Sequence, residues 1–360
     1  MSSTARFQGT NPWTDVHPDY LNYVQLWDSK WYHDIYDSGY PSTLPKDSLG
    51  TVLQNNWAFY PVFPFVVKGL HAITGLDWFY LSPLVATLSG FLAIFVIYKL
   101  FRLCASHQLA LWAVAFITFF PISPILQIPY AEATHLLFLA LALYFLVKRK
   151  YYLLFLVIPF MCLSRPAGVP FAAVMFFHTI HRWYTERENF NLKARILSCT
   201  LTVYASFWAL SWVFISASVT GVRSAYTETE LAWRGDNLSL FAPWFQMGWA
   251  VLGPLGFFAP FLIFPLFFMV LYSRPFDILA FDMRTWCASY MLYLFAVLAP
   301  QTSTFRMLLP LFPMALGAVN LSKDRSYRSA MILMFCLLQI VWVAWLWDYT
   351  PLPGGGDWPP

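Results

Sequence analysis

The amino-acid sequence predicts an all-α integral membrane protein with about ten transmembrane helices. Of the 360 residues, 59% are hydrophobic and only 11% are charged, whereas soluble domains carry roughly a quarter charged residues. A water-soluble fold of this length cannot bury so much apolar surface. The apolar runs at 79–101 and 196–217 also reach the length of about 20 residues that a spanning helix needs.

The first part of the chain, residues 1–56, is a long polar segment rich in Asp, Tyr, Trp, Asn and Pro. Its pattern from Val16 to Asp37 predicts one or two amphipathic juxtamembrane helices, closed by the turn sequence Gly-Tyr-Pro at 39–41. Residues 57–75 are apolar but interrupted by two prolines, a lysine and a histidine, so we expect an interfacial or partly inserted helix. The chain thus divides into an outer segment at 1–56, a membrane domain at 57–348 and an outer tail at 349–360.

Ten membrane segments follow the polar segment. They are expected at about 79–101, 109–122, 131–147, 151–164, 167–183, 196–217, 247–272, 285–300, 307–321 and 329–347. The segments 109–122 and 151–164 rise only about 21 Å at 1.5 Å per residue, which is less than the hydrocarbon core of about 30 Å. Their outer connections should therefore dip into the membrane, which is tolerated only where protein or a wet cavity covers the backbone.

The basic residues predict the side of the membrane on which each connection lies. Most of the 22 Lys and Arg residues fall in five connections, at 99–102, 148–150, 182–195, 274–284 and 323–328, and this side should be cytoplasmic. The polar N-terminal segment then faces outward, and the plasma membrane is the expected location. Because this outward segment follows no signal peptide or apolar run, we expect a further spanning helix before Met1 in the natural chain.

Three ionisable residues are expected near the outer ends of the membrane segments. Glu132 follows the first dipping connection, Arg165 lies in the second, and Arg306 lies in the last outer connection. Ionisable groups at membrane depth are functional candidates, and the fork of Arg donors suits a phosphate. Alternatively, Arg165 extends to lipid headgroups, and Glu132 is an interfacial carboxylate or a helix-capping group.

The densest polar cluster is Trp27-Asp28-Ser29-Lys30-Trp31-Tyr32-His33. On a helix, Asp28 and Tyr32 share one face and Trp27 and Trp31 form the next pair round. A carboxylate among aromatic rings can act as a general base on a hydroxyl nucleophile, and the rings suit a sugar. The alternative is an ordinary amphipathic surface helix. The loop that contains Trp233 is expected to cover the acceptor side.

Other function classes lack their sequence signals. The five cysteines lie in or beside apolar runs, as expected for small buried side chains and not for disulfides or a metal site. A Rossmann glycine pattern, a Walker sequence and a nucleic-acid-binding patch are all missing from the sequence. We therefore expect no metal, no cofactor and no nucleic acid.

Short motifs in a fixed order resemble a known family. They are Trp-Asp-x-x-Trp-Tyr at 27–32, Gly-Tyr-Pro at 39–41, Asn-Asn-Trp-Ala-Phe-Tyr-Pro at 55–61, Tyr-Ala-Glu at 130–132, Ser-Arg-Pro-Ala-Gly at 164–168 and Thr-Phe-Arg at 304–306 with Pro310 and Pro313. This order resembles the PIG-V type mannosyltransferases, which include GPI mannosyltransferase II and bacterial, especially actinobacterial, relatives. Ala131 and Ala133 stand where that family has hydroxyl residues.

The resemblance implies a GT-C membrane glycosyltransferase, which transfers a sugar, usually mannose, from polyprenyl phosphate to an acceptor outside the cytoplasm. With the residue chemistry above, Asp28 is the expected base, and Arg165 and Arg306 are the expected ligands of the donor phosphate. The expected sugar or acceptor contacts come from Trp27, Trp31, Tyr32, His33, Tyr60, Glu132 and Trp233. The expected partners are membrane lipids, the lipid-linked sugar and a glycolipid, glycan or protein acceptor.

Three alternatives stay open at the level of the sequence. A transporter or flippase of lipid-linked sugars would also be a polytopic protein, although no inverted repeat is evident and the polar groups gather at one face. A scaffold with the same fold could bind the lipid-linked sugar for a partner enzyme. An enzyme of this fold could also transfer another sugar, such as arabinofuranose or glucose.

Overall fold

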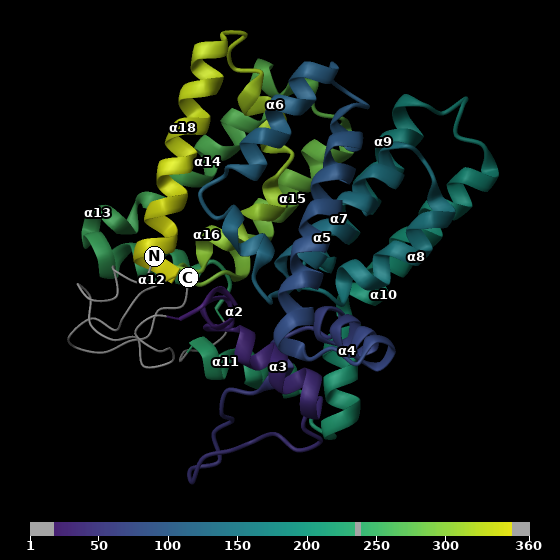
Figure 1. Cartoon of the computed structure of the whole chain (residues 1–360). Helices are drawn as coiled ribbons and strands as arrows, with labels where there is room; N and C mark the ends of the chain where they lie inside the picture. The colour runs from purple at the N-terminus through teal and green to yellow at the C-terminus, as the bar shows by residue number, and fades with distance from the viewer. Residues whose placement is uncertain (1–17, 235–238, 348–360) are drawn as a thin grey trace.

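Helices account for nearly all regular structure in the computed structural model, which describes residues 18–234 and 239–347. Within these ranges the chain is all-α without strands, as predicted. Most of the longer helices run side by side as a bundle, and the short helices α2, α3, α4 and α11 lie together at one end of it (Figure 1).

The helices of the first half of the chain are α2 (Tyr20–Val24), α3 (Ser29–Ser38), η1 (Asn56–Ala58), α4 (Val62–Thr74), α5 (Trp78–Phe101), α6 (His107–Thr118), η2 (Ser123–Gln127), α7 (Ala131–Val147), α8 (Tyr151–Cys162) and α9 (Gly168–Thr185). The second half contains α10 (Leu192–Thr220), α11 (Ala225–Arg234), α12 (Ala242–Leu252), α13 (Pro254–Phe257), α14 (Ala259–Leu271), η3 (Arg274–Ile278), α15 (Phe281–Val297), α16 (Thr304–Met307), η4 (Leu309–Leu311), α17 (Met314–Val319), α18 (Arg325–Val341) and η5 (Trp342–Trp347).

Capping residues define several helix ends. Ser106, Asn191 and Asp324 each accept a hydrogen bond from a backbone N–H in the first turn of α6, α10 and α18, which satisfies a donor that has no partner within the helix. Gly75 and Gly221 end α4 and α10 with φ of 71°, the left-handed conformation that glycine adopts without strain. These local signals are visible in the sequence.

Four helical stretches of the described chain are long and apolar enough to cross a membrane. They are Trp78–Phe101, Leu192–Thr220, Pro254–Leu271 and Arg325–Ala344. Other apolar helices are shorter, among them α6, α7 and α8. The predicted membrane character of the fold therefore agrees with these helices, whereas the number of about ten spans stays a prediction.

The single helix predicted at 247–272 is wrong, because the chain breaks at Gly253. This residue has φ of 61°, a conformation that glycine tolerates, and Pro254 follows it. The two helices on either side are in close contact: a Cβ on Gly256 would lie 1.8 Å from the carbonyl oxygen of Gly248. The hydropathy of this segment is that of a span, but its glycines fold it into a tight turn.

The segment 307–321 also differs from the predicted helix, because Pro310 and Pro313 interrupt it and leave only the short elements α16, η4 and α17. Side chains of α15 bind part of the irregular backbone: Trp286 Nε1 donates to the Pro310 carbonyl at 2.7 Å, and Tyr290 donates to the Met307 carbonyl at 2.9 Å. Irregular backbone at membrane depth requires such coverage by protein.

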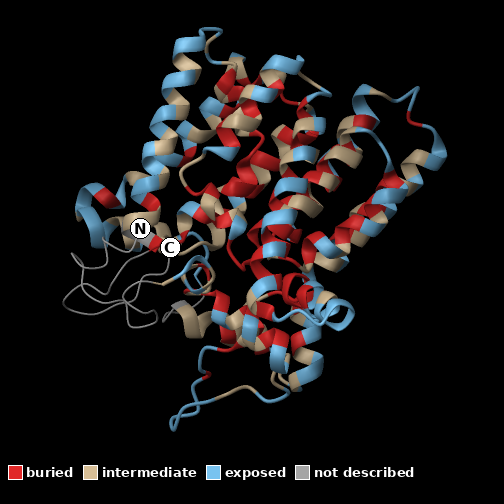
Figure 2. Cartoon of the chain, in the orientation of Figure 1, coloured by how far each residue is buried: buried red, intermediate tan, exposed pale blue. Residues whose placement is uncertain are grey.

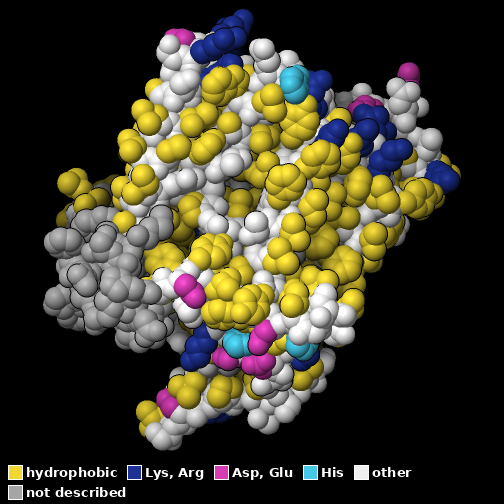
Figure 3. Space-filling view, viewed as in Figure 1, with side chains coloured by type: hydrophobic (Ala, Val, Ile, Leu, Met, Phe, Trp, Pro, Cys, Tyr) yellow, Lys and Arg dark blue, Asp and Glu magenta, His cyan; other side chains and the backbone are white. Residues whose placement is uncertain are grey.

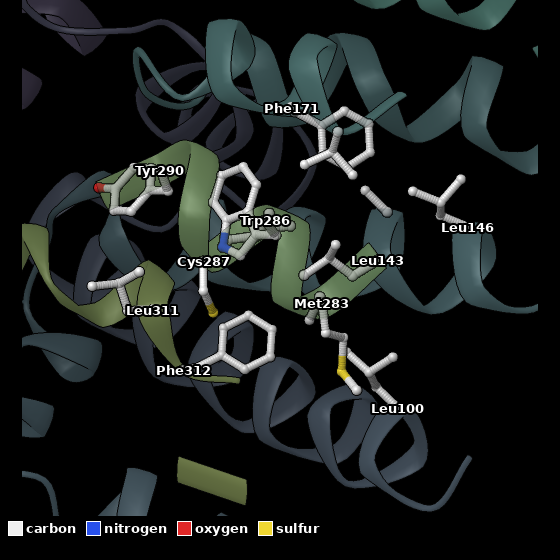
Figure 4. Packing of buried hydrophobic residues seen from close by; sticks show 14 of the residues in the cluster. Leu100, Leu143, Leu146, Phe171, Met283, Trp286, Cys287, Tyr290, Leu311 and Phe312 are labelled. Carbon is white, nitrogen blue, oxygen red and sulfur yellow. The ribbon is translucent and has the colours of Figure 1, made fainter. Parts of the chain in front are cut away.

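One apolar core holds the helices of the bundle together. In Figure 4, Met283, Trp286 and Cys287 of α15 lie among side chains of neighbouring helices, and all three are fully buried. Buried residues fill the interior and exposed residues lie on the outward faces of the helices (Figure 2). Large apolar side chains such as Phe91 and Val203 are 73% and 71% exposed, as expected for a surface that faces lipid.

A second apolar cluster attaches the N-terminal helices to the end of the bundle. Leu26 and Tyr32 of this segment pack with Phe63 of α4, Trp78 of α5 and Trp347 near the end of the described chain. Two helices, α2 and α3, are therefore present in the stretch where amphipathic helices were predicted, and they pack on the bundle. This docking brings Asp28 next to α7 and α16.

Candidate active site

The backbone around Asp28 is held from two directions. Trp27 has φ of 60°, an uncommon conformation for a bulky residue, and its indole N–H donates to the Trp347 carbonyl at 3.0 Å. The Asp28 backbone N–H donates to the hydroxyl of Tyr130 at 2.9 Å. Because Asp28 is the N-cap and α3 begins at Ser29, Trp27 lies outside the helix, and its predicted pairing with Trp31 on one helical face is wrong.

Four charged side chains from separate segments meet at this point, and we call them the ion quartet: Asp28, Arg306, Glu132 and Arg165. Arg306 contacts the Asp28 carboxylate at 2.5 Å and approaches Glu132 at 3.6 Å. Arg165 forms an ion pair with the same Glu132 oxygen. The charges alternate in sign and sum to zero. Charges removed from water need such partners, because an unpaired buried charge is strongly unfavourable.

Each member of the ion quartet is placed by a different element. Glu132 lies in the first turn of α7, where the helix dipole favours a negative charge. Arg165 lies in the turn between α8 and α9 and contacts the sulfur of Met307 at 2.7 Å. Arg306 lies in α16, and its guanidinium is 5.1 Å from the ring centre of Tyr130. The two arginines and two carboxylates predicted from the sequence therefore come together.

Aromatic rings form a wall beside Asp28. Trp31 stacks on Phe59, with ring centres 5.8 Å apart, and meets the edge of Trp233 at 5.2 Å. Tyr32 packs edge-on against Phe59 at 5.3 Å and lies 6.2 Å from the ring of Tyr130. Burial raises the pKa of the Tyr32 hydroxyl, so this group stays a neutral hydrogen-bonding group. Such rings with polar tips can hold the faces of a sugar.

Trp233 brings a polar atom to this wall. Its indole Nε1 is buried and has no hydrogen-bond partner among the described residues. A buried N–H without an acceptor is uncommon in folded proteins. The sequence predicts that the loop with Trp233 covers the acceptor side, and the structure brings Trp233 to the same rings as Trp31.

Two predicted site residues lie apart from the ion quartet. The Tyr60 hydroxyl donates to the Tyr226 hydroxyl at 3.4 Å, and burial raises the pKa of both groups. His33 is stacked on Trp78 at 5.2 Å and approaches Asp37 at 3.5 Å. Tyr60 therefore supports the contact between α11 and the turn that joins η1 to α4, and His33 lies on the exposed side of α3.

Tyr130 and Trp347 are site residues that sequence reasoning did not select. Tyr130 accepts from the Asp28 backbone, donates to the Leu26 carbonyl at 3.3 Å and lies beneath Arg306. Its position directly before the Ala131-Glu132 pair was the available signal. Trp347 donates from Nε1 to the Tyr23 carbonyl at 3.0 Å, and nothing in its apolar sequence context indicates this contact.

A second polar network lies away from the site, between α8, α9 and α15. His178 contacts Asp282 at 2.7 Å and the Tyr151 hydroxyl at 2.9 Å, and Arg182 donates to that hydroxyl at 2.6 Å. These side chains bind one another within the protein, which favours a structural role. Among the described residues, no group of three or more His, Cys, Asp or Glu side chains could hold a metal ion.

The two ends of the bundle differ in charge. Figure 3 shows Lys and Arg gathered at the end where α18 begins and α9 ends, whereas Asp, Glu and His cluster near α3 at the opposite end. Asp28 is the N-cap of α3, so the ion quartet lies at the end opposite to the large group of Lys and Arg side chains that this view shows. No protein-family model matches the chain, and no characterised protein shows a significant sequence match.

Proposed function

We propose that this protein is a membrane glycosyltransferase that transfers a sugar from a polyprenyl-phosphate-linked donor to an extracytoplasmic acceptor. The observation that carries the proposal is the buried ion quartet, which combines a carboxylate base with two guanidinium groups next to an aromatic wall. Mannose is the sugar implied by the motif resemblance, and a glycolipid, glycan or protein hydroxyl is the acceptor.

In the proposed reaction, an Asp28 carboxylate oxygen takes the proton of the acceptor hydroxyl while the acceptor oxygen attacks the anomeric carbon. The bond from that carbon to the phosphate oxygen breaks, and polyprenyl phosphate leaves with the electron pair. Attack opposite the leaving group inverts the anomeric configuration. Arg165 and Arg306 neutralise the charge that develops on the phosphate, and such preorganised electrostatic help is strongest in a site that excludes water.

Two further parts of the proposal concern the membrane. We propose a GT-C arrangement with about ten spans, in which short helices such as α6 and α8 stop below the outer surface. We also propose that the basic end of the bundle is cytoplasmic and that the ion quartet faces outward, at the plasma membrane. The uneven distribution of Lys and Arg supports this orientation.

The central test is Asp28→Asn, assayed in isolated membranes with labelled polyprenyl-phosphate-mannose. Loss of a general base lowers a rate by about 100- to 10,000-fold, so we expect label transfer to fall by at least about 100-fold while the protein stays inserted. Asp37→Asn is the matched control, because Asp37 also lies on α3 but is exposed. Undiminished transfer by Asp28→Asn would overturn the proposal.

A further inference from the structure

The ion quartet has a property that matters for anion binding: it is already neutral. Each guanidinium group contacts a carboxylate, and Arg306 contacts two. A sugar-linked phosphate carries a negative charge, and the released phosphate carries about 1.5 to 2 negative charges at pH 7. A buried neutral cluster offers no net attraction to such an anion, so one carboxylate must give up its cation when the phosphate enters.

The contacts indicate which carboxylate is exchanged. Glu132 forms ion pairs with two guanidinium groups and lies in the first turn of α7, where the helix dipole favours a negative charge. Within residues 18–234 and 239–347, Asp28 has one cationic partner, Arg306. The backbone of Asp28 is fixed independently by Tyr130, so its carboxylate can leave Arg306 without movement of α3.

Arg306 is suited to accept a new ligand. Its guanidinium lies over the Tyr130 ring, and its Nε is buried without a hydrogen-bond acceptor among the described residues. The planar fork of an arginine can contact a phosphate with two parallel hydrogen bonds. Arg306 can therefore keep Glu132 as a neighbour while it exchanges Asp28 for phosphate oxygens.

We propose that the donor phosphate replaces Asp28 on Arg306, so that binding of the donor itself releases the catalytic base. Before the donor arrives, the Asp28 carboxylate is held in the ion pair with Arg306. No covalent bond changes in this step, because one anionic ligand of Arg306 replaces another. The exchange predicts that the donor binds before the acceptor is activated, and it rests on the proposed transferase function.

The exchange predicts that an inactive variant binds polyprenyl phosphate more tightly than the wild type. Asp28→Asn removes the competing carboxylate, so the inactive variant should bind a short-chain radiolabelled polyprenyl phosphate about tenfold more tightly than the wild type, the size expected for one charge-assisted contact. Binding is measured on the purified full chain in detergent, with inorganic phosphate as a second ligand. Asp37→Asn makes the same charge change on the exposed side of α3 and should bind like the wild type.

Each outcome of the binding assay has a distinct meaning. Tighter binding of polyprenyl phosphate by Asp28→Asn than by the wild type supports the exchange. If Asp28→Asn binds only inorganic phosphate more tightly, the proposal that the phosphate ligand is lipid-linked is overturned. Equal or weaker binding by Asp28→Asn, together with a wild type that binds and transfers, overturns the exchange and leaves the proposed function standing. If neither protein binds polyprenyl phosphate, the proposed function fails with it.

A measurement on the wild-type protein covers the case in which Asp28→Asn does not fold. Polyprenyl phosphate should increase the modification of Asp28 by a membrane-permeant carbodiimide several-fold, as measured by peptide mass spectrometry, because the carboxylate has left Arg306. A phosphate that only adds to an intact ion quartet would leave this modification unchanged or lower it, and that result overturns the exchange.

Discussion

Arg306 links the two carboxylates of the site through one planar group. Arg306→Lys keeps the charge but replaces the fork by a single ammonium, which cannot reproduce both contacts. We expect sugar transfer to fall at least about tenfold, with a raised KM for the lipid-linked donor. Steady-state kinetics in membranes measure both constants. Arg284→Lys, outside the ion quartet, should leave them unchanged, and wild-type kinetics for Arg306→Lys would contradict its role.

Substitutions of Glu132 and Arg165 test whether the two buried charges stabilise each other. Removal of one partner from a buried pair costs about 3–5 kcal/mol, because the other charge stays uncompensated. Arg165→Met should therefore lower the free energy of unfolding in detergent by about this amount, and the double variant Glu132→Gln/Arg165→Met should recover part of the loss. Chemical denaturation followed by fluorescence measures the three proteins. Additive losses in the double variant would show that the pair is not coupled.

The residues of the ion quartet could be predicted from the sequence, but their pairing could not. Ionisable groups beside apolar runs are conspicuous, so the sequence predicts Asp28, Glu132, Arg165 and Arg306 as site residues. Which carboxylate meets which guanidinium depends on how segments far apart in the chain pack. The left-handed backbone of Trp27 has no local signal of the kind that a glycine gives.

At the level of elements, the close contact of α9 with α10 fixes the turn that contains Arg165. A Cβ on Gly168 would lie 2.7 Å from the Cα of Ala209 and 2.9 Å from the sulfur of Cys162. Gly168→Val should therefore separate these helices and destabilise the protein by about 1–3 kcal/mol, the usual range for overpacking.

Thermal unfolding in detergent measures the effect of Gly168→Val, and transfer activity reports on the position of Arg165. Gly69→Ala on α4 is the matched control, because nothing lies within 4 Å of its added Cβ. An unchanged unfolding temperature for Gly168→Val would contradict the close contact of α9 and α10.

Apolar helices could be predicted to within a residue or two where local signals agree with hydropathy. The predictions 79–101 and 131–147 correspond to α5 and α7. The segments 247–272 and 307–321 are not the continuous helices that hydropathy predicts, because hydropathy reports only that a segment is apolar, although Pro254–Leu271 is still long and apolar enough to cross a membrane. Gly253, Pro310 and Pro313 break the helix there, and partners such as Trp286 make the irregular backbone tolerable.

For the whole molecule, the charge difference between the two ends predicts the orientation in the membrane. In a variant without its five cysteines, new cysteines at exposed Ser48 and Ser326 mark the two ends. A membrane-impermeant maleimide added to intact cells should label Ser48→Cys and leave Ser326→Cys unlabelled until the membrane is opened, because basic connections stay inside. Labelling of Ser326→Cys alone in intact cells would reverse the orientation.

The ion quartet also sets an order of events during synthesis of the chain. Asp28 and Arg306 are separated by 278 residues, so at about 5–20 residues per second Arg306 is made roughly 15–55 s after Asp28. During this interval the N-terminal helices exist without the cation that neutralises Asp28. A polypeptide that terminates before Arg306 would therefore display the aspartate but never assemble the centre, and only a chain that extends past Arg306 can become competent.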